Sequence, residues 1–517
     1  MEFKQPEPLM KNIASATVSL LRMCTVLKIC LLLLLSACFT SLWAQQTPSK
    51  KPNIIYIYAD DLGYGELGVY GQKKIRTPHL DQLAAEGIRF TKHYTSTPVC
   101  APARCMLLTG RHGGHSFIRG NYELGGFADE EEGGQMPLPE GTVTIPRLLK
   151  ESGYRTGAIG KWGLGMAGSS GSPDRQGFDY FYGYLDQKQA HNYYPTHLWE
   201  NGQWDPLDNP PIQVHKKLDK NATDEDFAYF KGKEYAVDKM AEKTEKFIRE
   251  NKDQPFFLYL PLTIPHVSLQ APDQAVQEYI GQFEEKPYYG ENGYSSTRYP
   301  LSTYAAMITY LDTQVGKVLA QVKALGLEEN TLIMFSSDNG ATYNGGTDAQ
   351  FFNSLAGLRG GKGLVYEGGI RVPFMARWPG VISAGQTSDF VSVQYDMLAT
   401  LTDIAGAAKV PNDGISLLPI LTGKGKPAER EYLYFEFPER GGQLAVRFQK
   451  YKAVKTDMIK NRNAEWELYD MDIDETENNN IAGRHPDIIR TLDQIVKKEH
   501  WPATIREWEF IDPRFKK

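Results

Sequence analysis

The chain has 517 residues, a formal net charge of −6 and 41% hydrophobic residues. The near-neutral charge balance lacks the basic excess typical of proteins that bind nucleic acid, and the hydrophobic content excludes a disordered chain. Three of the five cysteines lie within the first forty residues, which excludes a mature protein held together by a framework of disulfides.

The first segment, residues 1–44, is predicted to be an export signal. Its apolar run at 26–35 follows basic residues and is too short for a comfortable membrane span. Two processing outcomes remain open: cleavage after Ala44, or a lipobox in which Cys38 carries a lipid and the signal ends before it. We therefore expect an exported protein, periplasmic or anchored through Cys38, with no integral membrane span after processing.

Apolar runs of strand length alternate with helical segments after a polar linker at 45–51. This pattern is typical of a large, mostly parallel sheet sandwiched by helices, and it predicts an α/β domain over 52–425. The expected strands are 53–58, 154–159, 256–262 and 331–336. The expected helices are 78–86, 145–151, 231–250, 304–325 and 392–405.

Two long segments without periodicity, 192–226 and 271–298, interrupt this alternation. Loops of this length inside a compact domain are usually functional when they are ordered. Near residue 429 the sequence changes to short alternating strands, which predicts a smaller antiparallel α+β subdomain over 426–517. Its expected elements are strands at 432–437, 444–448 and 451–455 and a helix at 488–498.

Polar side chains follow each of the four strands expected in the large domain. In chain order these residues are Asp60 and Asp61, Lys161, His266, and Asp338 and Asn339. Because functional side chains collect beyond the carboxyl ends of strands in an open α/β sheet, we expect them to meet. Three carboxylates and one amide suit Ca²⁺ or Mg²⁺, and the absence of a His/Cys cluster in the sequence argues against zinc.

Residues 98–111 read Pro-Val-Cys-Ala-Pro-Ala-Arg-Cys-Met-Leu-Leu-Thr-Gly-Arg. This segment resembles the Cys-x-Pro-x-Arg activation motif of type I, formylglycine-dependent sulfatases. Asp-Asp-Leu-Gly precedes it, and Gly-Lys-Trp, Pro-His, Ser-Asp-Asn-Gly, Leu-Arg-Gly-Gly-Lys-Gly and Trp-Glu-Leu-Tyr-Asp follow in the family's order. The resemblance covers residues 51–485 and implies the alkaline-phosphatase-like fold and a sulfatase catalytic domain.

The resemblance implies a role for particular residues of this chain. Cys100 would be oxidised by a formylglycine-generating maturation enzyme, and the hydrated aldehyde would present a geminal diol. The residues implied to hold Ca²⁺, in preference to Mg²⁺, together with that diol are Asp60, Asp61, Asp338 and Asn339. The residues implied to steady the formylglycine are Arg104 and Lys161, and those implied to face the sulfate ester are His266 and Lys362.

The chemistry of sulfate esters agrees with these implied roles. The anionic oxygens of the ester repel nucleophiles, so a metal and fixed cations must stabilise the charge of the transition state. One diol oxygen would attack sulfur while His266 or Lys362 gives a proton to the leaving alkoxide. Loss of a proton from the second hydroxyl would then expel the sulfate and re-form the aldehyde, a step that an unmodified serine could not perform.

One position departs from the family's pattern. Many members read Gly-Lys-Trp-His, whereas this chain has Gly163 in place of the histidine, so the usual base for the second hydroxyl is missing. His115 is one replacement, with His191 and His197 as alternatives, and each of them also fits a hydrogen-bonded structural histidine. The residues that we assign to substrate binding are His115, Arg119, Asn121 and His191.

Export, together with the aromatic loop at 192–208, favours a sulfated carbohydrate as the substrate, such as sulfated galactose or N-acetylgalactosamine. One alternative within the superfamily is a phosphodiesterase or phosphonate monoester hydrolase. An alternative of another class is a non-catalytic glycan-binding lipoprotein. Modification of Cys100 separates the enzyme from the binding protein, and only activity separates the two kinds of hydrolase.

Overall fold

The structure is a computed structural model that describes residues 1–2, 51–512 and 514. The predicted export signal, with Cys38 and Ala44, lies outside the described residues. Within the described part of the chain, no helix combines the length and the apolar character needed to cross a membrane. Pro52–Lys517 forms one compact unit.

A ten-stranded mixed sheet forms the centre of this unit, in the order β13-β2-β12-β11-β1-β10-β6-β7-β8-β9. Its middle five strands run parallel. They are β11 (Thr331–Ser337), β1 (Asn53–Ala59), β10 (Phe256–Pro261), β6 (Arg155–Lys161) and β7 (Tyr180–Tyr184). Shorter strands flank them, namely β13 (Gln386–Ser388), β2 (Ile88–Phe90), β12 (Phe374–Arg377), β8 (His197–Glu200) and β9 (Gln203–Pro206). The predicted large α/β sheet is confirmed, with antiparallel pairs added toward both edges.

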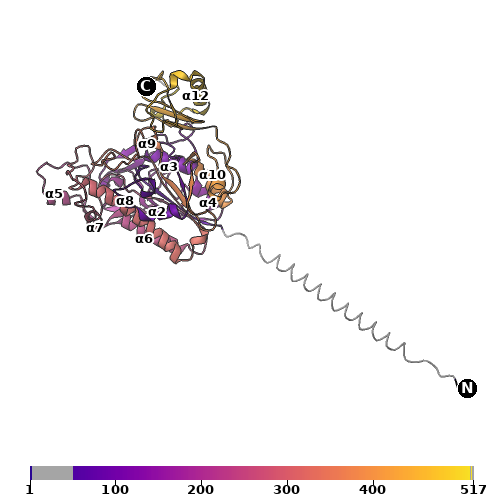
Figure 1. Cartoon of the computed structure of the whole chain (residues 1–517). Helices are drawn as coiled ribbons and strands as arrows, with labels where there is room; N and C mark the ends of the chain where they lie inside the picture. Colours follow the sequence, from indigo (N-terminus) through magenta and orange to yellow (C-terminus); the bar gives the residue numbers. More distant parts are fainter. Residues whose placement is uncertain (3–50, 513, 515–517) are drawn as a thin grey trace. The chain divides into compact units, whose positions relative to one another are not determined.

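Both faces of the sheet are covered because the side chains of β1 alternate between two apolar clusters. Ile55 and Ile57 belong to the cluster that includes side chains of three helices, α2 (Pro78–Ala85), α6 (Ala236–Glu250) and α8 (Pro300–Ala324). Ile54 and Tyr56 belong to the cluster that includes side chains of α3 (Cys100–Thr109), α4 (Ile145–Glu151) and α10 (Asp396–Ala405). The labels in Figure 1 show α6 and α8 side by side and α3 near α10.

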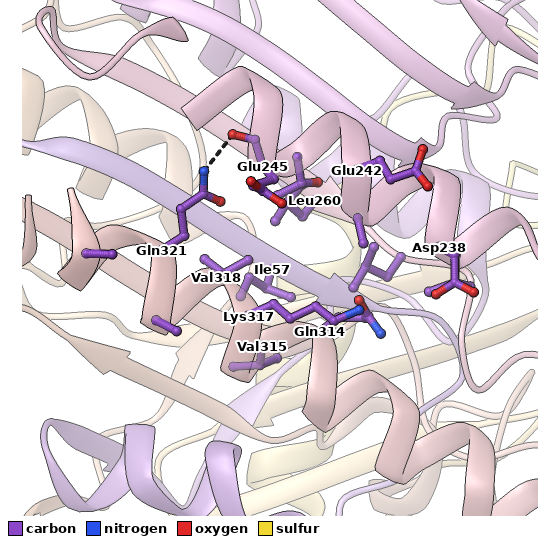
Figure 2. Close-up of a pocket in the computed structure, with 16 residues that line it drawn as sticks. Ile57, Asp238, Glu242, Glu245, Leu260, Gln314, Val315, Lys317, Val318 and Gln321 are labelled. Carbon is purple, nitrogen blue, oxygen red and sulfur yellow. Dashed lines mark hydrogen bonds between the residues drawn. The ribbon is translucent and has the colours of Figure 1, made fainter. Parts of the chain in front are cut away.

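A cavity of about 710 Å³ lies between α6 and α8. Figure 2 shows its apolar floor, which includes Ile57 and Leu260 from the sheet, and the acidic side chains of Glu242 and Glu245 on α6. Ile57 lies within β1 and not at its end, so the cavity opens beside the face of the sheet. Its lining includes no residue that the sequence predicts for the site.

Two predicted helices begin later than expected because other contacts hold the preceding backbone. Asn209 Oδ1 accepts the N–H groups of Lys233 and Glu234 at 2.8 and 2.9 Å, so α6 begins at Ala236. Ser392 and Val393 form the short strand β14, which pairs with β3 (His93–Tyr94), and the helix α10 follows from Asp396. The helix predicted at 304–325 instead begins at Pro300, which suits the first turn because proline lacks an N–H group.

The C-terminal region forms the expected antiparallel subdomain. Its four strands are β15 (Tyr432–Phe437), β16 (Gln443–Phe448), β17 (Tyr451–Lys455) and β18 (Glu467–Asp470), and its helix is α12 (Pro486–Glu499). The sequence did not predict β18 as a strand. The two long segments contain β8, β9, α5 (Asp224–Ala228) and α7 (Asp273–Gln277), joined by irregular backbone.

Candidate active site

The ends of β1 and β11 bring two polar pairs together. These strands are in register through Ala59 and Ser337, so the residues that follow each strand are neighbours. The backbone N–H of Asp61 donates to Asp338 Oδ1 at 3.0 Å. The Asn339 amide donates to Asp61 Oδ1 at 2.7 Å. The carboxylates of Asp60, Asp61 and Asp338 and the amide of Asn339 are all buried.

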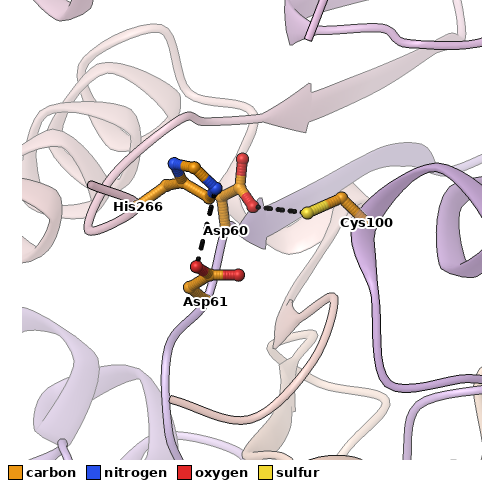
Figure 3. Close-up of side chains that lie close together, drawn as sticks. All are labelled: Asp60, Asp61, Cys100 and His266. Atoms are coloured by element: carbon orange, nitrogen blue, oxygen red, sulfur yellow. Dashed lines mark hydrogen bonds and ion pairs between the residues drawn. The ribbon is translucent and has the colours of Figure 1, made fainter. Parts of the chain in front are cut away.

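Cys100 is the first residue of α3 and faces the end of β1. Its Sγ lies 3.4 Å from Asp60 Oδ1, and Figure 3 shows this contact beside Asp61 and His266. Burial raises the pKa of the Cys100 thiol well above its usual range, and the Asp60 carboxylate raises it further. A thiol in this environment stays protonated and is a poor nucleophile. The position therefore suits a precursor of another group better than it suits a catalytic thiolate.

Two fixed cations, Lys161 and Arg104, lie against the carboxylates. Lys161 Nζ, at the end of β6, lies 2.7 Å from Asp60 Oδ2. Arg104, one turn into α3 from Cys100, lies 3.2 Å from Asp60 and 3.0 Å from Asp338, and it also donates to the carbonyl of Lys161. Both cations are almost wholly buried, so little water screens their attraction for the carboxylates.

The electrostatics of this cluster fit a hard cation. Burial and the charge of Asp60 raise the pKa of Asp338 to about 7, because both disfavour a negative charge on its carboxyl group. Asn339 Oδ1 is buried and has no hydrogen-bond donor. An oxygen-binding divalent cation would satisfy this amide oxygen and neutralise the carboxylates. The side chains of Asp60, Asp61, Cys100 and His266 place possible ligand atoms within 4.8 Å of one another, and Asp338 and Asn339 are hydrogen-bonded to Asp61 beside them.

His266 follows β10 and pairs with Lys362. The His266 Nδ1–H donates to the backbone carbonyl of Val267, so Nε2 is the free acceptor of the neutral ring. Lys362 Nζ lies 3.1 Å from this Nε2 and 2.8 Å from Asp61 Oδ2. Burial and the charge of Lys362 lower the pKa of His266, so Lys362 carries the proton in this pair.

Four rings pack beside His266 and form what we call the ring wall, namely Phe127, His191, His215 and Tyr294. His191 stacks on His266 with ring centres 5.1 Å apart and contacts Tyr294 at 5.0 Å. His215 Nε2 lies 3.3 Å from His191 Nδ1, and Phe127 packs against both histidines. These residues come from loops that are far apart in sequence, including both of the long segments expected to be functional.

The space beside Gly163 is filled by a glutamine. Gly163 has a φ of +73°, and a Cβ there would lie 2.7 Å from Gln187 Cγ. Gln187 is buried, its Oε1 has no donor, and its Nε2 lies 3.5 Å from Asn121 Oδ1. Asn121 Oδ1 also accepts the backbone N–H of Ala101 at 3.3 Å, which places Asn121 at the start of α3. Gln187, and none of the histidines, takes up the room that a side chain at position 163 would need.

His115 does not lie in the cluster around Asp60 and Cys100 but in a second group with His112 and Asp413. Its Nδ1 lies 3.0 Å from Asp413 and its Nε2 lies 3.5 Å from Glu499. Its ring is sandwiched between His112 and Trp501, each with its centre 4.1 Å away. His115 therefore connects the loop after α3 to the end of α12.

Arg119 and His197 are also engaged elsewhere. Arg119 is buried and donates to Glu436 Oε1 at 2.7 Å and to the carbonyls of Gly114 and Ser116. These contacts use the guanidinium for a junction with β15. His197 stacks on Trp204 at 4.1 Å and lies 3.3 Å from Glu132.

Sequence reasoning missed four residues that surround the site, namely Phe127, Gln187, His215 and Tyr294. None stands in a recognisable motif or at the end of a predicted strand. The only available signal was that His215 and Tyr294 lie in the two long segments expected to be functional. Their proximity is a tertiary contact that local patterns do not encode.

The chain is similar to known sulfatases over most of its length. The sequence profile of the family described as Sulfatase matches residues 52–407, and that described as N-sulphoglucosamine sulphohydrolase, C-terminal, matches 361–500. Human arylsulfatase A is 34% identical over 488 residues, which cover 86% of this chain and 87% of that protein. The N-acetylgalactosamine-6-O-sulfatase of Bacteroides thetaiotaomicron is 30% identical over 513 residues, with 87% and 93% covered.

A solved structure leads to the same assignment. The structure of Ps i-CgsB in complex with k-i-k-neocarrahexaose superimposes with a TM-score of 0.71 at 28% identity, covering 87% of this chain and 93% of that one. The profile match spans more than half of the sequence and includes the buried acidic cluster, Cys100 and the surrounding cations. The chain therefore belongs to the sulfatase family of the alkaline-phosphatase-like superfamily and is a sulfuric ester hydrolase.

Proposed function

We propose that this protein is an exported sulfatase that hydrolyses sulfate esters of carbohydrates through a formylglycine formed from Cys100 and a bound Ca²⁺. The observation that carries the proposal is the position of Cys100 Sγ, 3.4 Å from Asp60, within a buried group of oxygen donors and cations. A buried, protonated thiol has no evident use there, whereas an oxygen nucleophile made from it would lie beside the metal.

When present, the formylglycine would supply an oxygen nucleophile for the sulfur atom, and Ca²⁺ would supply a positive charge for the oxygens of the sulfate. The remaining work falls to side chains of this chain. Lys161 and Arg104 hold Asp60 ionised: burial alone would raise the pKa of Asp60, but the surrounding cations, Lys161 foremost, bring it well below its usual range. Their fixed charges are directed at the site before the reaction begins, so they stabilise negative charge at little reorganisation cost.

The leaving alkoxide of a sugar is a strong base and needs a proton. Lys362 Nζ holds that proton, hydrogen-bonded to His266 Nε2 at 3.1 Å. Burial alone would lower the pKa of Lys362, but the Asp61 carboxylate raises it well above its usual range. The Lys362–His266 pair therefore stores a proton at the edge of the site where the ester oxygen would lie.

Two observations support a carbohydrate substrate, namely the ring wall and the substrates named for similar proteins. His191 and Tyr294 lie next to His266, and Phe127 packs on His191; aromatic side chains of this kind commonly line binding sites together with a few polar groups. The bacterial relative is named for N-acetylgalactosamine 6-O-sulfate, and the similar solved structure contains a neocarrahexaose. We propose sulfated galactose or N-acetylgalactosamine residues as the first candidates.

The proposal includes export and maturation. The protein would leave the cytoplasm through the signal at residues 1–44 and remain periplasmic, or attached to a membrane through a lipid on Cys38. A formylglycine-generating enzyme would act on the segment that begins at Cys100. Mass spectrometry of the mature N-terminus distinguishes cleavage after Ala44 from a lipidated Cys38.

Regiodefined sulfated monosaccharides test the substrate class. We expect release of sulfate from at least one galactose or N-acetylgalactosamine ester, and slower turnover of glucose esters. Strong turnover of phenolic or steroid sulfates with no desulfation of any sugar would overturn the carbohydrate assignment. Preferred turnover of a phosphonate monoester would favour the alternative hydrolase.

Mass spectrometry of the peptide that contains Cys100 tests the nucleophile. In a host with maturation machinery we expect formylglycine at this position, and Cys100→Ala should abolish turnover while preserving thermal stability. Chelation should lower the melting temperature of the wild-type protein, and Ca²⁺ should restore it better than Mg²⁺. An unmodified thiol in a fully active preparation would contradict the proposal.

A further inference from the structure

The ring wall contains one proton whose position is fixed by the backbone. The backbone N–H of Tyr294 donates to His215 Nδ1 at 3.0 Å. A backbone N–H can only donate, so His215 Nδ1 must be the unprotonated nitrogen of that ring. In the neutral ring the proton then lies on Nε2.

The same argument fixes the proton of the neighbouring ring, that of His191. His215 Nε2 lies 3.3 Å from His191 Nδ1. Because His215 Nε2 is the donor, His191 Nδ1 must accept, and the proton of neutral His191 lies on its Nε2. Among the described residues, no partner is found for this Nε2–H.

Packing holds both rings in place. Phe127 stacks on His191 with ring centres 5.4 Å apart and contacts His215 at 4.1 Å. Tyr294 contacts both histidines, at 5.0 and 5.1 Å. Burial lowers the pKa of each histidine, which agrees with neutral rings.

His191 lies next to the reacting groups, since its ring stacks on that of His266 with centres 5.1 Å apart and an interplanar angle of 17°. A donor on this ring can contact the part of the substrate adjacent to the sulfate ester. A fixed donor selects an acceptor, such as a hydroxyl or carbonyl oxygen, at that position.

We propose that His215 is a positioning residue that, anchored by the backbone of Tyr294, fixes the Nε2–H tautomer of His191 as a hydrogen-bond donor for a substrate oxygen beside the sulfate ester. The identity of that oxygen as part of a sugar rests on the proposed function. The position of the proton rests only on the geometry of the three residues.

The experiment compares three variants of the mature protein. His215→Phe keeps a ring of similar size but has neither acceptor nor donor. His215→Gln keeps one acceptor and one donor about as far apart as the two ring nitrogens. His485→Phe alters a histidine of the C-terminal subdomain and is the matched control.

We expect His215→Phe to raise KM for the preferred sulfated sugar about tenfold, with a smaller effect on kcat. His215→Gln should recover most of the loss, and His485→Phe should match the wild-type protein. In a His191→Phe background, His215→Phe should cause no further loss, because the effect passes through His191. Wild-type KM in His215→Phe, or a full additional loss in the double variant, would overturn the proposal.

Long-range ¹H–¹⁵N spectra of protein labelled at histidine nitrogens give a readout independent of activity. The His191 signals, assigned by their absence in His191→Phe, should show an unprotonated Nδ1 in the wild-type protein and mixed tautomers in His215→Phe. A protonated His191 Nδ1 in the wild-type protein would refute the proposed tautomer even if His215→Phe fails to fold. If no sugar is desulfated, the proposed function fails while these spectra still decide the position of the proton.

Discussion

Lys362 is held between two neighbours of opposite character. Asp61 draws its ammonium group at 2.8 Å, and the neutral His266 accepts from it at 3.1 Å. The carbonyl of Val267 determines which nitrogen of His266 is the acceptor. At the scale of single residues, chemistry therefore depends on proton positions that side-chain identity alone leaves open.

Lys362→Met should lower kcat for a sugar sulfate by about a hundredfold or more, because the leaving alkoxide loses its proton source. The loss should be much smaller for 4-nitrophenyl sulfate, whose leaving group needs little protonation. Steady-state kinetics on both substrates measure the difference, with Lys362→Arg as the variant that keeps the charge. Equal losses on both substrates would show that Lys362 acts only through its charge or its contact with Asp61.

Gly163→Ala should destabilise the protein through two separable effects. A left-handed backbone costs a non-glycine residue about 1–2 kcal/mol, and the new Cβ would also lie 2.7 Å from Gln187 Cγ. Gly406→Ala, at a φ of +61° with open space, is the matched control for backbone strain alone. Thermal unfolding should show a larger loss for Gly163→Ala, partly restored by Gln187→Ala. Equal losses at the two glycines would contradict the contact with Gln187.

At the scale of elements, a hairpin of β4 (Glu123–Gly125) and β5 (Glu132–Gln135) carries Phe127 to the ring wall. Buried Asp186 anchors the hairpin by accepting the backbone N–H groups of Gly133 and Gly134 at 3.1 and 2.7 Å. Its other oxygen accepts from the Gln135 amide and the backbone of Lys188. One carboxylate thus fixes the element that presents Phe127.

Asp186→Ala should loosen this hairpin, because each buried donor left without an acceptor costs about 1–3 kcal/mol. Hydrogen exchange should accelerate in peptides covering residues 123–135, and KM for the sugar substrate should rise. Asp174→Ala, at an exposed aspartate, provides the comparison. Unchanged exchange in the hairpin of Asp186→Ala would show that strand pairing suffices to hold it.

At the scale of the whole unit, the C-terminal subdomain is joined to the catalytic part through buried charges. Glu436 on β15 forms ion pairs with Arg119 Nη1 at 2.7 Å and with His500 Nδ1 at 3.0 Å. Burial alone would lower the pKa of His500, but Glu436 and Glu509 outweigh it and raise the pKa to about 9. His500 is therefore charged in the folded protein at neutral pH.

This shift makes the junction sensitive to pH. A histidine whose pKa is raised on folding contributes stability that is fully present below its unfolded pKa of about 6.5 and is lost as pH rises through about 9. His500→Gln should lower the melting temperature at pH 6, and its difference from the wild-type protein should shrink toward pH 10. A difference between His500→Gln and the wild-type protein that is constant with pH would disprove the linkage.

Most of the fold and the centre of the site could be predicted from local sequence. Strand-length apolar runs located β1, β6, β10 and β11, because buried parallel strands are apolar on both faces. The polar residues at their ends converge because parallel strands share one edge. The ion pairs of His115 with Asp413 and Glu499 and of Arg119 with Glu436 could not be predicted, because nothing local reveals which carboxylates lie opposite them.

The sequence by itself determined the strand ends, the activation motif at Cys100 and the family, since each is written in neighbouring residues. Only the tertiary structure decided that Gln187 fills the space beside Gly163 and that His215 meets His191. It also decided which histidine nitrogens accept hydrogen bonds, because that depends on distant donors. The backbone N–H that fixes His215, for example, belongs to Tyr294, 79 residues later in the chain. Periodicity fixes which face of an element is buried, whereas contacts between irregular loops depend on how the whole chain packs.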